Sequence, residues 1–251
     1  MNVEGSLRKS MSSRAVTGFE RRASPRELPE LMDGDCSYED FRGCLRVLEQ
    51  INRWFLGYRS TLAWLERVPR GTNVPVHIVD VGSGGGDLLR QIAAWARRRR
   101  TAVRLTGIDL NPYAARAARE STPKELGITW VTGDALLFQP ERPVDVVVSS
   151  LMAHHLEDEE VVALLRWMET TASQGWFIND LARSASGARL FGWVAALARW
   201  HHFVRHDGPV SFRRSFVQED WERLLAAAQV PRETVTLEPW RPGRLCVGRW
   251  K

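Results

Sequence analysis

Strand-like and helix-like patterns alternate along the middle of this 251-residue chain. The strand-like runs are Val76–Val81, Arg104–Asp109, Thr129–Thr132, Val144–Ser149 and Trp176–Asn179. Helical patterns separate them at Asp87–Arg100, Pro112–Glu120 and Asp158–Thr171. Such alternation is typical of a parallel sheet with helices on both faces. We therefore expect a doubly wound α/β fold.

The C-terminal part of the chain breaks this rhythm. About 50 residues separate the fifth strand from the next strand-like run, far more than a crossover needs. They contain an aromatic helix at Ala188–Phe203, a polar loop at 205–214, and a helix whose expected S-x-x-Q cap is Ser215 with Gln218. Two final runs, Glu233–Glu238 and Arg244–Trp250, flank a Pro/Gly turn and predict an antiparallel hairpin. The sheet is therefore expected to be seven-stranded and mostly parallel, with helical cap elements.

The N-terminal part divides into two expected segments. Residues 1–36 are polar and lack periodicity, which predicts a flexible tail. A helical pattern begins at Ser37, where Asp40 completes an S-x-x-D cap, and it ends near Val68. We expect a tail at 1–36, N-terminal helices of a cap at 37–70, and a main domain at 71–251 with a cap insertion at about 183–215.

Composition argues against several classes of protein. No apolar run approaches the roughly 20 residues of a membrane-spanning helix, and the N-terminus lacks the apolar segment of a secretory signal. The cysteines Cys36, Cys44 and Cys246 are too widely spaced for a disulfide framework or a zinc site, which fits a cytoplasmic protein. The net charge of +5 includes one dense basic cluster, Arg97–Arg100, which ends a helical pattern and has no interleaved aromatic residues. No nucleic-acid partner is therefore expected.

The first strand runs directly into a glycine-rich loop, VDVGSGGGDLL at Val79–Leu89. Gly82, Gly84 and Gly86 let the backbone turn tightly and let a ligand approach bare peptide. A phosphate-binding P-loop is excluded because no Gly-Lys-Ser/Thr follows. The NAD fingerprint fails because Asp87 stands where its third glycine belongs, beside the place of an anionic diphosphate. A cationic ligand without phosphate, such as S-adenosylmethionine (SAM), suits this acidic loop.

Two acids downstream agree with an adenosyl ligand. Asp109 ends the second strand, where an acid can hold both ribose hydroxyls. Asp134 follows the third strand, at the same edge of the expected sheet, where it can accept the adenine amino proton.

Four motifs in this order resemble the class I SAM-dependent methyltransferases, of the small-molecule type related to ubiquinone/menaquinone-biosynthesis methyltransferases. They are VDVGSGGGD (79–87), GIDLNP (107–112), TGDA (132–135) and VDVVVSSLMAHHL (144–156). The resemblance covers residues 70–180 well and extends more loosely to the closing hairpin. It implies a Rossmann-like methyltransferase fold, with SAM as cofactor and residues 71–251 as the SAM-binding domain.

The resemblance also implies roles for single residues. The methionine part of SAM would lie against Asp80, Gly82, Ser83 and Gly84, and the ribose against Asp109. The adenine would pack on Leu110 and meet Asp134 and Ala135 at its edge, with Ser149 beneath the sulfonium. Arg53 or Arg59 is a candidate for the SAM carboxylate, with a solvated position as the alternative for each.

Histidines after the fourth strand are the candidate bases for methyl transfer. His154 and His155 follow that strand at the crevice where open α/β sheets bind ligands, and the sequence does not choose between them. Asp180, at the end of the fifth strand, is a candidate base or a group that orients one. His206, beside Asp207 in the expected loop, is a candidate for the acceptor pocket.

These features predict a SAM-dependent methyltransferase that acts on a small apolar acceptor. O-methylation of a phenolic or polyketide-like compound in secondary metabolism is the first expectation. C-methylation of a quinone precursor, an RNA methyltransferase and a non-catalytic SAM-binding protein are the alternatives. We expect a monomer or homodimer with no metal, no nucleic-acid partner and no membrane span.

Overall fold

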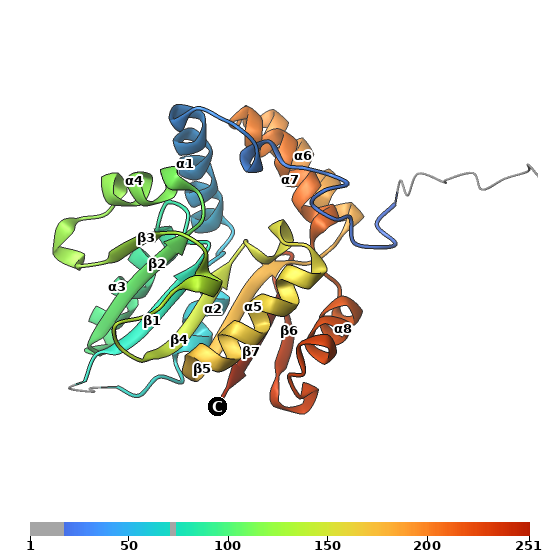
Figure 1. Cartoon of the computed structure of the whole chain (residues 1–251). Helices are drawn as coiled ribbons and strands as arrows, with labels where there is room; N and C mark the ends of the chain where they lie inside the picture. Colours follow the sequence, from blue (N-terminus) through green and yellow to red (C-terminus); the bar gives the residue numbers. More distant parts are fainter. Residues whose placement is uncertain (1–17, 71–73) are drawn as a thin grey trace, which may run out of the picture.

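The computed structural model describes residues 18–70 and 74–251 of the chain. Its centre is a seven-stranded sheet in the order β3-β2-β1-β4-β5-β7-β6 (Figure 1). Strands β1 to β5 run parallel, and β7 pairs antiparallel with both β5 and β6. The strands are β1 (Val76–Val81), β2 (Val103–Asp109), β3 (Thr129–Thr132), β4 (Val144–Ser150), β5 (Ala172–Leu181), β6 (Thr236–Trp240) and β7 (Arg244–Trp250). The predicted fold class, a mostly parallel sheet with an antiparallel C-terminal hairpin, is confirmed.

Helices cover both faces of this sheet. The helices are α1 (Tyr38–Trp54), α2 (Arg59–Leu65), α3 (Asp87–Arg99), α4 (Pro112–Ser121), α5 (Asp158–Thr171), α6 (Ala185–Leu197), α7 (His202–Arg214) and α8 (Gln218–Ala228). Because side chains alternate along a strand, β4 contributes to two cores. Val147 packs with Leu165 and Trp221 from α5 and α8, whereas Val148 packs in the core that holds Leu89 of α3.

The remaining helices form a cap over the carboxyl ends of the parallel strands. Helices α6 and α7 make an antiparallel pair, and α7 packs against α1 (Figure 1). Cys44 and Ile51 of α1 share a small apolar core with Phe203 and Val204 of α7. This arrangement leaves a space between the cap and the ends of β1, β2 and β4, which is where open α/β sheets bind their ligands.

The predicted polar loop at 205–214 is wrong, because these residues form most of α7. Gly208 gave the segment its loop-like character, but this glycine lies where α7 packs closely against α6. A Cβ atom at Gly208 would overlap the ring of Phe191. A glycine that allows two helices to approach has the same sequence signature as a glycine in a turn. The expected helix at Ala188–Phe203 is accordingly divided between α6 and α7.

The predicted cap of the following helix is also wrong. Ser215 ends α7, and its Oγ donates to the carbonyl of Ser211 at 2.6 Å. Helix α8 begins at Gln218, and the Asp220 carboxylate accepts the Val217 N–H at 3.0 Å. The S-x-x-Q pattern does not form a cap here, because the Ser215 hydroxyl donates its hydrogen bond to the preceding helix instead.

Residues 18–36 do not behave as the flexible tail expected for 1–36. Arg22 is buried, and its Nε donates to the carbonyl of Arg214 at 2.7 Å. Its Nη1 pairs with Asp158 at 2.7 Å, and its guanidinium lies over the Phe216 ring. Polar residues in this segment find charged partners on the folded domain, which composition does not reveal. Residues 1–17, the rest of the expected tail, lie outside the described residues.

No helix among the described residues has the length and apolarity to cross a membrane.

Candidate active site

A large cavity opens between the cap and the carboxyl ends of β1, β2 and β4. Its volume is about 1290 Å³, above the roughly 300–1,000 Å³ of a typical small-molecule site. Its walls come from the glycine loop, the segment after β4, α1, α6, α7 and the N-terminal segment 18–36. A space of this size can hold two small ligands side by side.

The glycine loop forms one end of the cavity. Gly82, Gly84 and Gly86 have φ angles of 73°, 48° and 73°, in the left-handed region that favours glycine. The Gly84 N–H donates to Asp109 Oδ2 at 2.8 Å, which ties the loop to the end of β2. Gly82, Ser83 and Gly84 line the cavity, so a ligand there would meet exposed backbone.

Asp80, at the end of β1, places an unsatisfied acid beside this loop. It is buried and lines the cavity, and its Oδ1 has no hydrogen-bond partner among the described residues. Burial raises the pKa of Asp80 well above its usual value, and the nearby carboxylates of Asp87 and Asp109 raise it further. A cationic group in the cavity would satisfy this oxygen and favour its ionised form.

The other predicted adenosyl residues lie along the same wall. Asp109, Leu110, Asp134 and Ala135 all line the cavity. Burial raises the pKa of Asp109, although the N–H groups of Gly84 and Asn111 oppose this. Leu110 presents an exposed apolar surface, and Asp134 caps the short helix that starts at Ala135. The chain thus brings an acid, an apolar side chain and a second acid into one row.

Ser149 is an exception among the predicted cofactor residues. It is fully buried, does not line the cavity, and donates from Oγ to the carbonyl of Val81 at 2.9 Å. Ser150, the next residue, lines the cavity in its place. Because alternate side chains of a strand face opposite ways, an error of one residue at a strand end selects the wrong serine.

His154 also lines the cavity and is held by Asp180. Its Nδ1 is 2.7 Å from Asp180 Oδ1, and its backbone N–H donates to Asp180 Oδ2 at 3.0 Å. A carboxylate accepts here, so the proton of a neutral ring lies on Nδ1 and Nε2 is left unprotonated. Burial alone would raise the pKa of Asp180, but His154 and the hydrogen bonds to the carboxylate lower it.

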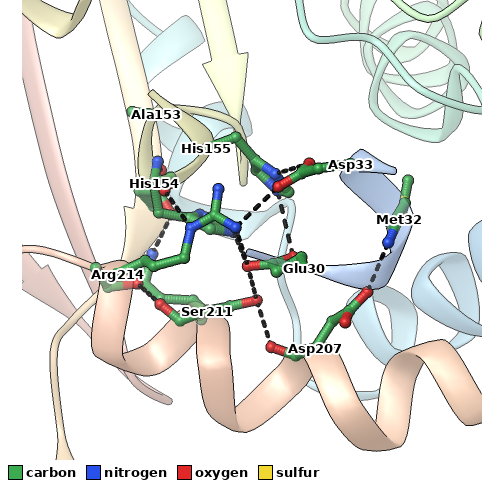
Figure 2. Close-up of polar contacts among 12 residues, drawn as sticks. Glu30, Met32, Asp33, Ala153, His154, His155, Asp207, Ser211 and Arg214 are labelled. Atoms are coloured by element: carbon green, nitrogen blue, oxygen red, sulfur yellow. Dashed lines mark hydrogen bonds and ion pairs between the residues drawn. The ribbon is translucent and has the colours of Figure 1, made fainter. Parts of the chain in front are cut away.

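His155 belongs to an adjacent polar cluster with Glu30, Asp33 and Arg214 (Figure 2). Its Nδ1 is 2.7 Å from Asp33 Oδ1. Glu30 lies between the two histidines, with its carboxylate oxygens 3.8 Å from Nε2 of His154 and Nε2 of His155. Burial alone would lower the pKa of His155, but Glu30 and Asp33 outweigh it and raise that pKa.

Arg214 provides the buried cation of this cluster. Its Nη1 lies 2.8 Å from Asp33 Oδ2 and 3.4 Å from Glu30 Oε1, and its Nε donates to the His154 carbonyl at 3.0 Å. Ser211 donates to the same Glu30 oxygen at 2.9 Å (Figure 2). The arginine therefore joins α7, the N-terminal segment and the histidine pair into one network.

Three predicted residues lie away from this site. His206 is half-exposed and pairs with Asp207, and only Asp207 of the two lines the cavity. Asp207 instead accepts the backbone N–H groups of Leu31 and Met32, and so anchors the N-terminal segment (Figure 2). Arg53 and Arg59 border a separate, shallower pocket, so neither reaches the large cavity.

Sequence reasoning missed Glu30, Asp33 and Arg214. Glu30 and Asp33 fall within the segment expected to be a tail, and Arg214 within the expected polar loop. Their contacts join residues more than 100 positions apart, so no local pattern reports them. The one signal available was the density of charged residues in two segments that otherwise lack periodicity.

Sequence comparison agrees with this geometry. Residues 78–175 match a family model described as a methyltransferase domain. The trans-aconitate 2-methyltransferase of Streptomyces avermitilis is 28% identical over 163 residues, which cover 61% of this chain and 59% of that protein. An uncharacterized methyltransferase of Bacillus thuringiensis is 31% identical over 94 residues, which cover 37% of this chain and 41% of that protein. The chain thus spans about three fifths or less of each relative's length.

Solved structures share the fold at low sequence identity. A plantazolicin methyltransferase in complex with a pentazolic desmethylPZN analog and SAH superposes with a TM-score of 0.57 and 17% identity, covering 85% of this chain and 96% of that chain. Human N-acetylserotonin methyltransferase in complex with SAM superposes with a TM-score of 0.59 and 16% sequence identity, covering 86% of this chain and 56% of that chain. These structures show that the chain has the fold of SAM-dependent methyltransferases, and the family match places a methyltransferase domain at residues 78–175.

Proposed function

We propose that this chain transfers the methyl group of SAM to an acidic hydroxyl on an apolar small molecule, such as a phenolic or polyketide-like compound. One observation carries the proposal. His154, whose ring is held by the buried Asp180, lines the same cavity as the glycine loop with its unsatisfied Asp80. A base for the acceptor and a site for a cationic methyl donor would therefore share one cavity.

The residues at the glycine loop fit SAM. Asp80 has a free carboxylate oxygen for the amino group, and Gly82 to Gly84 offer backbone to the methionine part. Asp109 would hold the ribose, and Leu110, Asp134 and Ala135, which line the same cavity, would meet the adenine. Ser150, which lines the cavity, would take the role expected of Ser149. When bound, SAM supplies a methyl group already activated by its sulfonium.

One part of the cavity wall is apolar. Its side chains come from the cap and include Leu190, Phe191, Val194, Val204 and Phe212. An apolar acceptor would be buried against this wall, which favours binding by the removal of apolar surface from water. We propose that residues 18–36, α1, α6 and α7 together form the acceptor-binding cap of the SAM-binding domain.

His154 is the proposed base. A phenol has a pKa near 10, so removing its proton at neutral pH needs an acceptor in the site. The proton would pass from the acceptor hydroxyl to Nε2 of His154. Asp180 would continue to accept the hydrogen bond from Nδ1–H and would stabilise the resulting imidazolium. The cap must hold the acceptor oxygen roughly 3–3.5 Å from the methyl carbon and in line with its bond to sulfur.

The buried acids of the site argue against a polyanionic acceptor. One relative is named for trans-aconitate, a tricarboxylic acid. In this chain Glu30, Asp33 and Asp180 lie around the histidine pair, with Arg214 already paired to two of them. A second and third carboxylate on the acceptor would meet negative charge, so we favour a neutral apolar molecule with one acidic hydroxyl.

The decisive experiment measures cofactor binding and methyl transfer separately. Calorimetry with SAM tests the cofactor site, and no heat at millimolar SAM would overturn the proposal. Methyl-deuterated SAM is then incubated with alkyl phenols, quinols and fatty acids, and products are analysed by mass spectrometry and NMR. An O-CD₃ phenol ether is the expected product. A C-CD₃ product would assign the chain to carbon methylation instead.

Two further outcomes would assign the chain a different function. Transfer to RNA whose rate falls steeply with salt would identify a nucleic-acid methyltransferase, because phosphate contacts release counterions. SAM binding without transfer to any acceptor, RNA included, would identify a binding protein. Either result would overturn the proposed O-methylation.

A further inference from the structure

Helix α6 is apolar on its outer side as well as its inner side. Ala188 and Ala195 face the interior and are buried. Leu190, Trp193 and Leu197 follow at helical spacing on the opposite side, and Trp193 and Leu197 are 80% and 88% exposed. A surface helix of a water-soluble domain normally places polar residues on that side.

A second group of exposed apolar residues lies at the end of α1. Trp54, Phe55 and Leu56 are consecutive and exposed. The Trp54 ring lies 6.5 Å from the ring of Trp200, which in turn lies 5.7 Å from Phe191 of α6. The end of α1 and the end of α6 therefore meet around Trp200. We name the combined set the α1–α6 apolar surface: Trp54, Phe55, Leu56, Leu190, Trp193 and Leu197.

The charged residues within the two stretches that carry this surface are all of one sign. The chain has no Asp or Glu at positions 50–65, nor at positions 181–206. These stretches carry five exposed arginines for which no ion pair is seen within residues 18–70 and 74–251: Arg53, Arg59, Arg189, Arg199 and Arg205. Exposed tryptophan and leucine among unpaired arginines are typical of protein segments that lie in the interface of an anionic bilayer.

This charge pattern argues against a second copy of the chain as the partner. A two-fold interface brings the same patch of each copy together. Here that would bring one set of unpaired arginines against another, with no acid from either stretch to compensate. Anionic headgroups supply the missing negative charge, and the acyl region accepts the exposed rings and leucines.

The α1–α6 apolar surface is also continuous with the cavity. Phe55 and Leu190 belong to the surface and line the cavity as well. A molecule that enters from the membrane would therefore pass along apolar side chains to the apolar wall near Phe191.

We propose that the α1–α6 apolar surface docks this protein on anionic lipid bilayers, with Trp193 and Leu197 inserted at the interface. The docking itself is independent of the proposed function. A second part of the inference rests on the proposed function. It is that the methyl acceptor is an amphiphilic molecule that the protein takes up from the bilayer.

Vesicle flotation with the full-length protein tests the docking. The probes are vesicles of phosphatidylcholine alone and of phosphatidylcholine with about a third phosphatidylglycerol, each at low and high salt. We expect binding to the anionic vesicles that weakens at least several-fold with salt, because salt screens the attraction between the arginines and the anionic headgroups. Absence of binding, or equal binding to both vesicle types, would overturn the proposal.

Paired variants identify the surface. The double variant Trp193→Glu with Leu197→Glu should lose vesicle binding at least tenfold. Arg189→Gln with Arg199→Gln should lose the preference for anionic vesicles. Val74→Glu is the matched control, because Val74 is also apolar and 78% exposed but precedes β1, at the amino ends of the parallel strands and away from the cap. Calorimetry with SAM verifies that each variant is folded.

Light scattering after gel filtration tests the alternative that a second copy of the chain binds the α1–α6 apolar surface. A dimer that the double glutamate variant converts to a monomer, together with unchanged vesicle binding, would assign the surface to self-association and overturn the proposal. Failure of the proposed methyl transfer would leave the flotation result intact, so the two hypotheses fail separately.

Discussion

His154 and Asp180 are joined by two hydrogen bonds, one from the imidazole Nδ1 at 2.7 Å and one from the His154 backbone N–H at 3.0 Å. One carboxylate thus fixes both the position of the residue and the orientation of its ring. An asparagine at 180 has one acceptor oxygen for these two donors. Asp180→Asn should therefore lower kcat by at least about tenfold and leave the Kd for SAM unchanged, because the ring loses its orientation.

His154→Ala removes the proposed base itself. We expect kcat to fall by about 10²–10⁴, the range of a general base, with cofactor affinity retained. His206→Ala is the matched control, because His206 is half-exposed and does not line the cavity. Steady-state rates with a phenolic acceptor at saturating SAM give the comparison. Equal kcat for wild type and His154→Ala would remove the histidine from the chemistry.

Asp80→Asn should have opposite effects on stability and on cofactor binding. The pKa of Asp80 is raised by burial and by neighbouring acids, so its ionised form opposes folding of the free protein at neutral pH. The variant should unfold a few degrees higher, since about 1 kcal/mol corresponds to roughly 2–4 °C in a chain of this size. SAM binding should weaken about 10- to 100-fold, because a charged hydrogen bond is lost. Calorimetry and thermal unfolding together check the prediction, and a change of both in the same direction would contradict it.

Two glycines of the cap offer a matched pair of variants. A Cβ at Gly208 would overlap the Phe191 ring, whereas a Cβ at Gly192 would make an ordinary contact of 3.5 Å with Pro209. Gly208→Ala should therefore separate α6 from α7 and raise the acceptor KM severalfold, with the Kd for SAM unchanged. Gly192→Ala should be neutral or slightly stabilising, as alanine is favoured in helices. Similar behaviour of the two variants would show that the close approach has no functional role.

The Asp33–His155 pair predicts how stability depends on pH. Burial alone would raise the pKa of Asp33, but His155 and Arg214 lower it, so its contribution is present above the unfolded pKa and is lost as pH falls toward the folded value. The raised pKa of His155 contributes stability at low pH that is lost as pH rises through the folded value. Urea unfolding between pH 3 and 8 should show a shallower acid decline for Asp33→Asn than for wild type. Parallel curves would contradict the assignment.

Removal of metal ions should not change activity. Glu30 and the two histidines converge, as a metal site would require. However, the Arg214 guanidinium already lies 3.4 Å from Glu30 and 2.8 Å from Asp33, so a second cation there would be repelled. We expect the same kcat before and after dialysis against EDTA. A loss that Mn²⁺ or Zn²⁺ restores would show that the histidines are ligands.

Local patterns predicted the parts of the structure that depend on local sequence. The bounds of β1 and β3 match the expected runs, because a short run rich in β-branched residues and bounded by turn residues defines a strand within a few positions. The row of acids along the cavity was predictable for the same reason, since Asp80, Asp109 and Asp134 each lie at or just after the end of a strand. Ser149 failed because its direction depends on the register of β4.

The acceptor side was much less predictable. Its shape depends on how α6, α7 and the N-terminal segment pack on the domain, and such contacts join distant residues. Gly208 and Ser215 were misinterpreted because each serves a neighbouring helix rather than a turn or a cap. Glu30 and Asp33 had no local signal, because their partners lie more than 100 positions away.

The hydrogen bond between Arg22 and Arg214 spans 192 positions of the chain. Residues 18–36 leave the ribosome early, yet their partners on α7 are synthesised much later. Contacts of such long sequence separation form slowly, because the intervening chain must first be ordered. During folding, the row of acids along the cavity is therefore expected to be complete before Glu30 and Asp33 reach the histidines. The order of assembly would then make the acceptor-binding cap the last part of the proposed active site to form.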